Sequence, residues 1–119
     1  MTKNLCASNQ LNIKEMIIDD FYRWLLTLEF PAYCRVNIKK VNFENNALDH
    51  DGLKRTLVID FDNDIIIGKF VVWDDNSCFT ELIDGHSTES VIHERFDFKT
   101  IKELQMSFQS ILTIFNDNL

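Results

Sequence analysis

Three groups of side chains have residue types that could do chemistry: closely spaced aspartates, three histidines, and a set of acids on predicted turns. Asp60, Asp62 and Asp64 alternate like the first ligands of a calcium-binding loop. Such a loop needs glycine at its sixth position and glutamate at its twelfth, where this chain has Ile65 and Val71. The three aspartates are therefore interpreted as a solvated strand end and turn.

The histidines do not form a recognisable site. His50, His86 and His93 lack the spacing of a helical zinc site, and no cysteine is close enough in sequence to complete one. Cys78 could pair with His86 or His93 after folding, but nothing in the sequence adds an orienting group and an oxyanion hole. We therefore expect no catalytic, cofactor-binding or metal-binding residues, and no enzyme. An enzyme or small-molecule binder would need a deep pocket near Cys78 and His86.

Negative charge is concentrated in the second half of the chain. Residues 1–59 hold eight Lys or Arg against seven Asp or Glu, whereas residues 60–119 hold four against twelve, so the second half accounts for the net charge of -7. An acidic surface repels nucleic acid and anionic membranes and attracts a basic partner. The acids on predicted turns and strand ends that we expect to adjoin are Asp74, Asp75, Glu81, Asp84 and Glu89. They could be a solubilising surface or a docking site, and Trp73 beside them could be a core residue or an interface anchor.

Two helices are predicted, one near each end of the chain. The first begins near Asn12, where Glu15 has the spacing of a capping box, continues with helical apolar spacing to Leu28, and is stopped by Pro31. The last begins at Thr100, with Glu103 as its capping partner and helical apolar spacing to Phe115.

Between the helices the sequence predicts about five short strands. They are Tyr33–Phe43, Leu57–Phe61, Ile65–Trp73, Cys78–Ile83 and Val91–Phe98. Several of the connections are tight turns, which can join only antiparallel neighbours, so the sheet should be an antiparallel meander. Two amphipathic helices must then cover one face. The predicted class is α+β, with the other sheet face open to water or a partner.

Composition favours a single globular domain over residues 1–119, with 1–11 as a polar lead-in. Cys6, Cys34 and Cys78 are odd in number and widely spaced, which favours reduced thiols in a cytoplasmic protein. No run approaches the roughly 20 apolar residues of a membrane span. We therefore expect a soluble protein with neither a membrane nor a nucleic acid as its partner.

One segment carries a resemblance to a known family. Residues 68–77 read GKFVVWDDNS, a glycine, a strand, a tryptophan and an acidic turn, followed by Glu81, Ile83, Asp84 and the closing helix. Over residues 57–115 this resembles the TriTu-type immunity proteins of contact-dependent growth inhibition systems. The family turn has a glycine where this chain has Asn76 and Ser77.

The resemblance implies a bacterial, cytoplasmic, non-enzymatic inhibitor of one cognate toxin domain. Toxins of this group are typically RNases that cut tRNA, some acting with translation elongation factors. A nuclease presents a basic surface to phosphates, which an acidic inhibitor could occlude. The expected toxin-binding residues are Asp62, Asp64, Trp73, Asp74, Asp75, Glu81, Asp84 and Glu89.

The sequence leaves an alternative function and the oligomeric state open. A cytoplasmic secretion chaperone for an effector protein would also be small and acidic, and it would show exposed apolar patches on its helices and sheet. An unpaired edge strand could also pair with its twin to form a homodimer.

Overall fold

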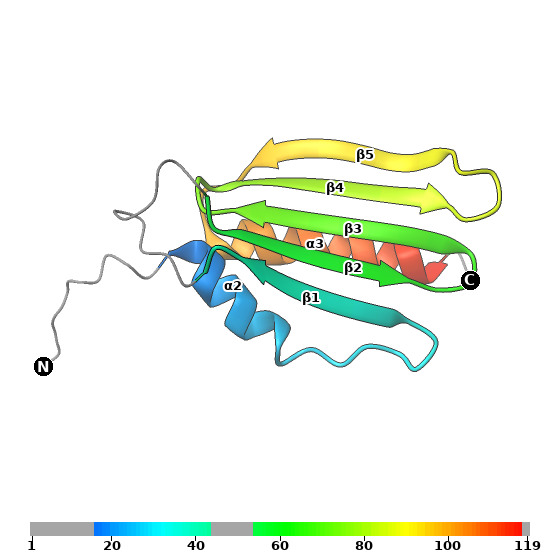
Figure 1. Ribbon diagram of the computed structural model, residues 1–119, viewed down its shortest axis with the longest axis horizontal. Helices are drawn as coiled ribbons and strands as arrows, with labels where there is room; N and C mark the ends of the chain where they lie inside the picture. Colours follow the sequence, from blue (N-terminus) through cyan, green and yellow to red (C-terminus); the bar gives the residue numbers. More distant parts are fainter. Residues whose placement is uncertain (1–15, 44–53, 118–119) are drawn as a thin grey trace, which may run out of the picture.

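The computed structural model describes residues 16–43 and 54–117, which form one five-stranded antiparallel sheet with two helices against it (Figure 1). The strands follow one another across the sheet in sequence order, so the predicted α+β meander is confirmed. Their bounds are β1 Arg35–Val41, β2 Thr56–Asp62, β3 Ile66–Trp73, β4 Ser77–Asp84 and β5 Ser90–Asp97.

Alternation of side chains fixes which face of each strand is buried. In β2, Leu57, Ile59 and Phe61 are buried and the residues between them are only half-buried. β3 is also mostly apolar on its other side, where only Lys69 is charged, which fits its position in the middle of the sheet. Each strand therefore presents one set of side chains to the helices and the alternate set to the opposite side.

Both helices lie behind the same face of the sheet (Figure 1). α2 spans Ile17–Leu25 and α3 spans Ile101–Asp117. Asn12 and Glu15 lie outside the described residues, but the predicted start is wrong for α2. Met16 has an extended backbone and its N–H donates to the Asp19 carboxylate at 3.1 Å, so this helix begins at Ile17. α2 ends before the expected Leu28, because Thr27 closes a tight turn in which its backbone N–H and its hydroxyl both donate to the Trp24 carbonyl, at 2.9 and 2.7 Å.

The capping box predicted for α3 is confirmed. The Thr100 hydroxyl accepts from the Glu103 backbone N–H at 3.1 Å, and the Glu103 carboxylate accepts from the Lys99 N–H at 2.7 Å. These bonds satisfy donors that have no partner within the helix. The start of α3 is thereby fixed directly after β5.

Aromatic rings join the two layers. Phe108 of α3 lies 5.0 Å from Phe70, 5.9 Å from Phe21 of α2 and 6.2 Å from Phe61, measured between ring centroids. Each buried ring contributes hydrophobic stabilisation and edge-to-face contact. One cluster therefore holds both helices against the sheet.

Gly68 permits the closest of these contacts. The Phe61 ring lies over it, and a Cβ atom at position 68 would fall only 2.2 Å from Phe61 Cε2. Any side chain there would collide with the ring. The glycine therefore allows β2 and β3 to pair with a phenylalanine directly opposite.

Candidate functional site: the open face of the sheet

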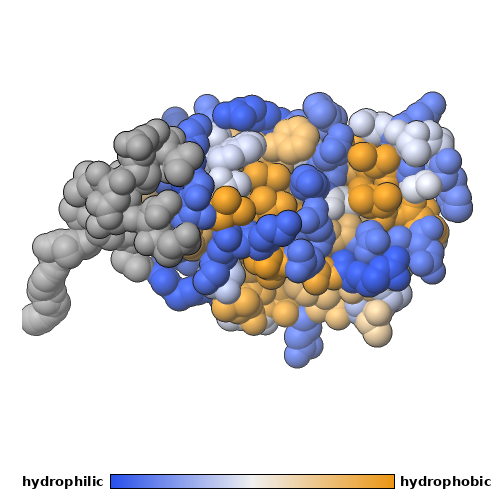
Figure 2. All heavy atoms as spheres, in the orientation of Figure 1, coloured by the Kyte–Doolittle hydropathy of each residue, from blue (hydrophilic) through white to orange (hydrophobic). Residues whose placement is uncertain are grey.

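We call the side of the sheet opposite the helices the open face; no described helix or strand covers it. Its residues align in rows across the strands, because antiparallel pairing places side chains of the same face opposite one another. Figure 2 shows this face, with apolar side chains in separate groups among hydrophilic ones.

The central row of the open face is apolar. Val58, Val71 and Phe79 are directly opposite one another on β2, β3 and β4. Val71 is only 8% exposed although no helix covers it. Its neighbours on the sheet therefore cover it, and the row forms a continuous apolar strip across three strands.

Trp73 lies on this face, at the end of β3. It is half-buried, and the Arg95 guanidinium lies 5.0 Å from its ring centroid. Arg95 also donates to the Ser77 hydroxyl at 3.3 Å. Trp73 is thus not a core residue between the sheet and the helices. Its ring is also not fully free to contact a partner, because a cation from β5 stacks on it.

The next row carries charges of alternating sign. Asp60, Lys69, Glu81 and His93 follow one another across β2 to β5. Lys69 lies 3.6 Å from Asp60, and His93 lies 3.2 Å from Glu81. Exposed pairs of this kind contribute little to stability, but each acid of the row has a partner on the next strand.

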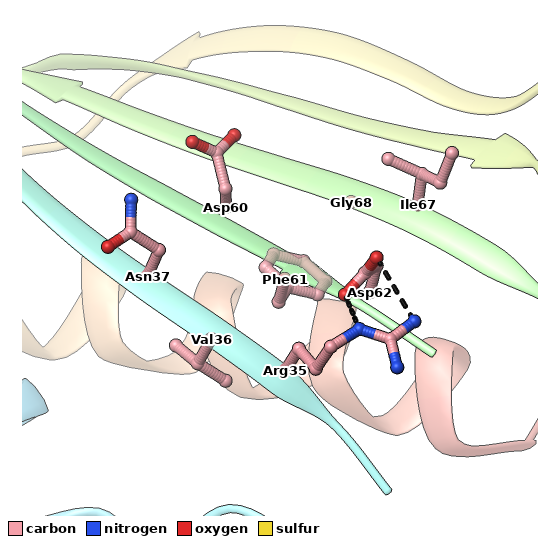
Figure 3. Close-up of a pocket in the computed structure, with 8 residues that line it drawn as sticks. All are labelled: Arg35, Val36, Asn37, Asp60, Phe61, Asp62, Ile67 and Gly68. Carbon is pink, nitrogen blue, oxygen red and sulfur yellow. Dashed lines mark hydrogen bonds and ion pairs between the residues drawn. The ribbon is translucent and has the colours of Figure 1, made fainter. Parts of the chain in front are cut away.

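Beyond the charged row the face is hollowed (Figure 3). The cavity has a volume of about 360 Å³ and is lined by Arg35, Val36, Asn37, Asp60, Phe61, Asp62, Ile67 and Gly68. Ile67 is 51% exposed at its edge, opposite Ile83 of β4. Arg35 donates to both carboxylate oxygens of Asp62, at 3.0 and 3.4 Å, and this contact raises the pKa of the guanidinium. The cavity thus combines an exposed apolar rim with a fixed ion pair.

Two ends of the sheet carry the acids predicted for binding. The first, which we call the Arg55 end, comprises Asp19, Lys54, Arg55, Asp74 and Asp75. Arg55 donates to both oxygens of Asp19 at 2.9 and 3.0 Å, and its backbone N–H donates to Asp74 at 3.0 Å. The side chains of Arg55 and Asp74 are only 11% and 13% exposed. These contacts tie α2 to the sheet.

Asp75 at the Arg55 end is also engaged within the chain. It accepts from Lys54 Nζ at 2.6 Å and from the Ser77 backbone N–H at 3.1 Å. These donors, Lys54 first, lower the pKa of the Asp75 carboxyl. Asn76 in the same turn has φ 66°, so it takes the left-handed conformation that glycine favours.

The opposite end, which we call the Asp84 end, comprises Asp62, Asp64, Asp84 and Glu89. Asp84 accepts from the backbone N–H groups of His86 and Ser87 at 2.8 and 3.2 Å, which lowers the pKa of its carboxyl. The Asp64 side chain is 94% exposed, with only a 3.6 Å contact to Arg35. The charges at this end largely face solvent.

The structure does not gather the predicted acids into one group. Ile66 pairs with Asp84 whereas Trp73 pairs with Ser77, seven residues farther along β3. The Asp74–Asp75 turn and the Asp84 turn are therefore about 23 Å apart at the rise of a strand, with Glu81 between them. Consecutive hairpin turns lie at opposite ends of a meander, so this separation was implicit in the predicted topology.

Comparison with protein families shows which family the chain belongs to. The family model described as "Immunity protein TriTu" matches residues 19–114. The chain belongs to the TriTu immunity protein family. No curated protein matches the sequence. The match starts in α2 and ends within α3, so it includes every strand of the sheet.

Membership of the TriTu family places the chain among immunity proteins, whose partner is a toxin and whose action is generally not catalytic. The geometry around Cys78 fits this. Cys78 is buried on the helix side of the sheet, and burial raises the pKa of its thiol to about 12. His93 pairs with Glu81 on the open face, so the sheet itself lies between thiol and imidazole.

Among the residues that the structure describes, no three histidine, cysteine, aspartate or glutamate side chains are grouped so that they could hold a metal ion. Asp60 pairs with Lys69 and Asp62 with Arg35, so the alternating aspartates are engaged separately. His50 lies outside the described residues. Neither described helix is long and apolar enough to span a bilayer.

Two features of this TriTu protein escaped sequence reasoning. Ile67 was assigned only to a strand, although the run Ile65–Ile66–Ile67 must place an isoleucine on each face. Arg55 was not singled out at all. Its partner Asp19 is 36 residues away, and no local pattern indicates such a contact.

Proposed function

We propose that this chain neutralises a nuclease toxin by holding the toxin's basic surface against the open face of the sheet. The observation that carries the proposal is the open face itself, which has exposed apolar groups that no described element covers, on a member of an immunity family. A sheet face left open in this way is suited to a partner.

The apolar residues would supply most of the binding free energy. Ile67 and Ile83 lie beside the cavity, and Val71 and Phe79 lie in the central row. Burying Ile67, Ile83 and Phe79 against a partner removes apolar surface from water, at about 25 cal/mol per Å². Val71, which is only 8% exposed, would add little. The charged row between the two groups would fix the register of the partner.

The Asp84 end would steer the toxin. Asp64, Asp84 and Glu89 project charge into solvent at the end of the sheet that carries the cavity. A nuclease needs a basic surface for phosphates, and opposite charge accelerates association at low salt. The expected binding residues at this end are therefore Asp64, Asp84 and Glu89, whereas Asp62 already accepts from Arg35 and would contribute less.

The Arg55 end would contribute less. Asp74 and Asp75 already have cationic or backbone partners, and Trp73 carries Arg95. Their charges add to the overall field, but pairing with a toxin would first require breaking these contacts. Glu81 is similarly engaged with His93. We expect Trp73, Asp74 and Asp75 to act at the margin of the interface, whereas Glu81 lies in the charged row between the two apolar groups.

The finer identity of the toxin rests on the family resemblance. A tRNA-cutting RNase delivered by contact-dependent growth inhibition would meet its substrate in the cytoplasm, so its inhibitor would act there. Occlusion of the basic site would be sufficient, with no reaction required of this chain.

The decisive experiment is rescue of cells that express the cognate toxin domain, which we expect the gene immediately upstream to encode. Ile67→Arg should abolish rescue and weaken binding about 100-fold, because a new cation would face a basic surface and an apolar contact would be lost. The matched control is Leu26→Arg, since Leu26 is also an exposed apolar residue, 61% accessible, but lies after α2. Unchanged rescue and affinity for Ile67→Arg would overturn the proposed face.

A further inference from the structure

One backbone edge of β5 is unpaired among the described residues. β5 is the last strand of the sheet and pairs only with β4. A bulge at Leu82 and Ile83 disturbs the register near Ser90, whereas the stretch from Ile92 to Asp97 is regularly paired. An edge of this kind presents N–H and C=O groups to which another strand can bond.

A shallow, widely open groove lies beside this edge, between β5 and α3. Its volume is about 440 Å³, and it is lined by Glu94, Phe96, Glu103, Met106, Ser107 and Ser110. Met106 is 56% exposed there. The lining holds two carboxylates and no lysine or arginine, so the groove is both acidic and partly apolar.

We infer that β5 and this groove receive an extended, cationic segment of the toxin, which adds to the sheet as a sixth strand. This inference rests on the proposed function, because it takes the toxin as the occupant. Backbone hydrogen bonds along β5 would supply affinity, and alternate side chains of the segment would enter the groove.

The groove is suited to lysine or arginine side chains. The Glu103 carboxylate is held in place by the Lys99 N–H, so it is already oriented. Glu94 lies on β5 on the helix side, opposite Thr80. An incoming cation could lie between these two carboxylates, with its aliphatic stem against Met106 and Phe96.

The other edge of the sheet does not offer the same chemistry. β1 carries Arg35, Lys39 and Lys40 and has no acid in its sequence. A cationic segment would be repelled there. Charge therefore favours β5 over β1 as the edge that accepts the toxin.

A second copy of this chain is the less favourable occupant of β5. Pairing of two β5 strands would bring the Glu94 and Glu103 carboxylates of both copies to neighbouring grooves, with no cation in either lining. Like charges brought together in this way disfavour association.

The test is amide hydrogen exchange on the full chain, alone and with a catalytically inactive form of the toxin domain encoded upstream. We expect amides of β5 to exchange at least about tenfold more slowly in the complex, with those of β1 unchanged as an internal control. Glu94→Lys should raise the Kd about tenfold, and Glu29→Lys, an equal charge change at an exposed position between α2 and β1, should not.

The outcomes separate this inference from the proposed function. A complex that forms and protects the open face, but leaves β5 exchange and the Glu94→Lys affinity unchanged, overturns the added strand and leaves the proposed function intact. Absence of any complex overturns both. A free chain that sediments as a dimer, and loses the dimer with Glu94→Lys, would show that the occupant is a second copy and overturn the inference.

Discussion

The Arg55 end and the Asp84 end of the sheet carry similar acidic turns in different environments. At the Arg55 end, Asp74 and Asp75 are bound by Arg55 and Lys54 from the segment before β2. At the Asp84 end, Asp84 accepts only backbone N–H groups and Asp64 faces solvent. Arg35 also reaches the Asp84 end, but its contact with Asp64 is exposed, whereas Arg55 and Asp74 are largely buried. The comparison shows that an acidic turn is structural where a cation holds it in a largely buried contact, and remains available to a partner where the contact is exposed.

The largest effect should come from removing the cation of the Arg55 end. Arg55→Met leaves Asp19 and Asp74 as two largely buried carboxylates without their shared partner. Removing one member of a buried ion pair typically costs about 3 kcal/mol or more. Urea denaturation should show a lower unfolding midpoint with little change in slope. A loss below about 1 kcal/mol would mean that Arg55 does not hold the two layers together.

Charge reversal at the Asp84 end should instead affect association. Asp64→Lys removes a solvent-facing acid, so stability should change by no more than about 0.5 kcal/mol, while the association rate with the toxin falls about tenfold at low salt. Glu29→Lys makes the same change in net charge away from this end and serves as the control. Stopped-flow kinetics would measure the association rates of both variants. Equal slowing by the two would show that only net charge matters.

The smallest effect concerns pH. The pKa of Asp75 is lowered in the folded state, by Lys54 first and then Ser77. Its contribution to stability is therefore present above the unfolded pKa near 3.8 and is lost as pH falls through the folded value. Asp75→Asn should flatten the decline in stability between roughly pH 5 and pH 3, by less than about 1 kcal/mol because the side chain is partly exposed. Parallel declines in the two proteins would contradict this.

Much of the fold follows from local patterns in the sequence. The Asp- and Asn-rich turns predicted antiparallel pairing, and Thr100 with Glu103 predicted the start of α3. Such features depend on residues within a few positions of one another. They can therefore be predicted without knowledge of tertiary packing.

The site depended on contacts that no local pattern contains. Arg55 reaches Asp19 across 36 residues, and Arg95 stacks on Trp73 from another strand. The separation of Asp75 from Asp84 could have been predicted, because successive turns of a meander alternate between the two ends of the sheet. What could not be predicted was at which of those turns a cation would hold the acids in a largely buried contact.

The contact between Phe61 and Gly68 links the variation of two positions. A ring occupies the volume that a side chain at position 68 would need, so neither residue can change freely by itself. Enlarging position 68 requires position 61 to shrink, as in Gly68→Val combined with Phe61→Ala. Among relatives of this protein, the two positions should therefore substitute together, one gaining bulk as the other gives it up.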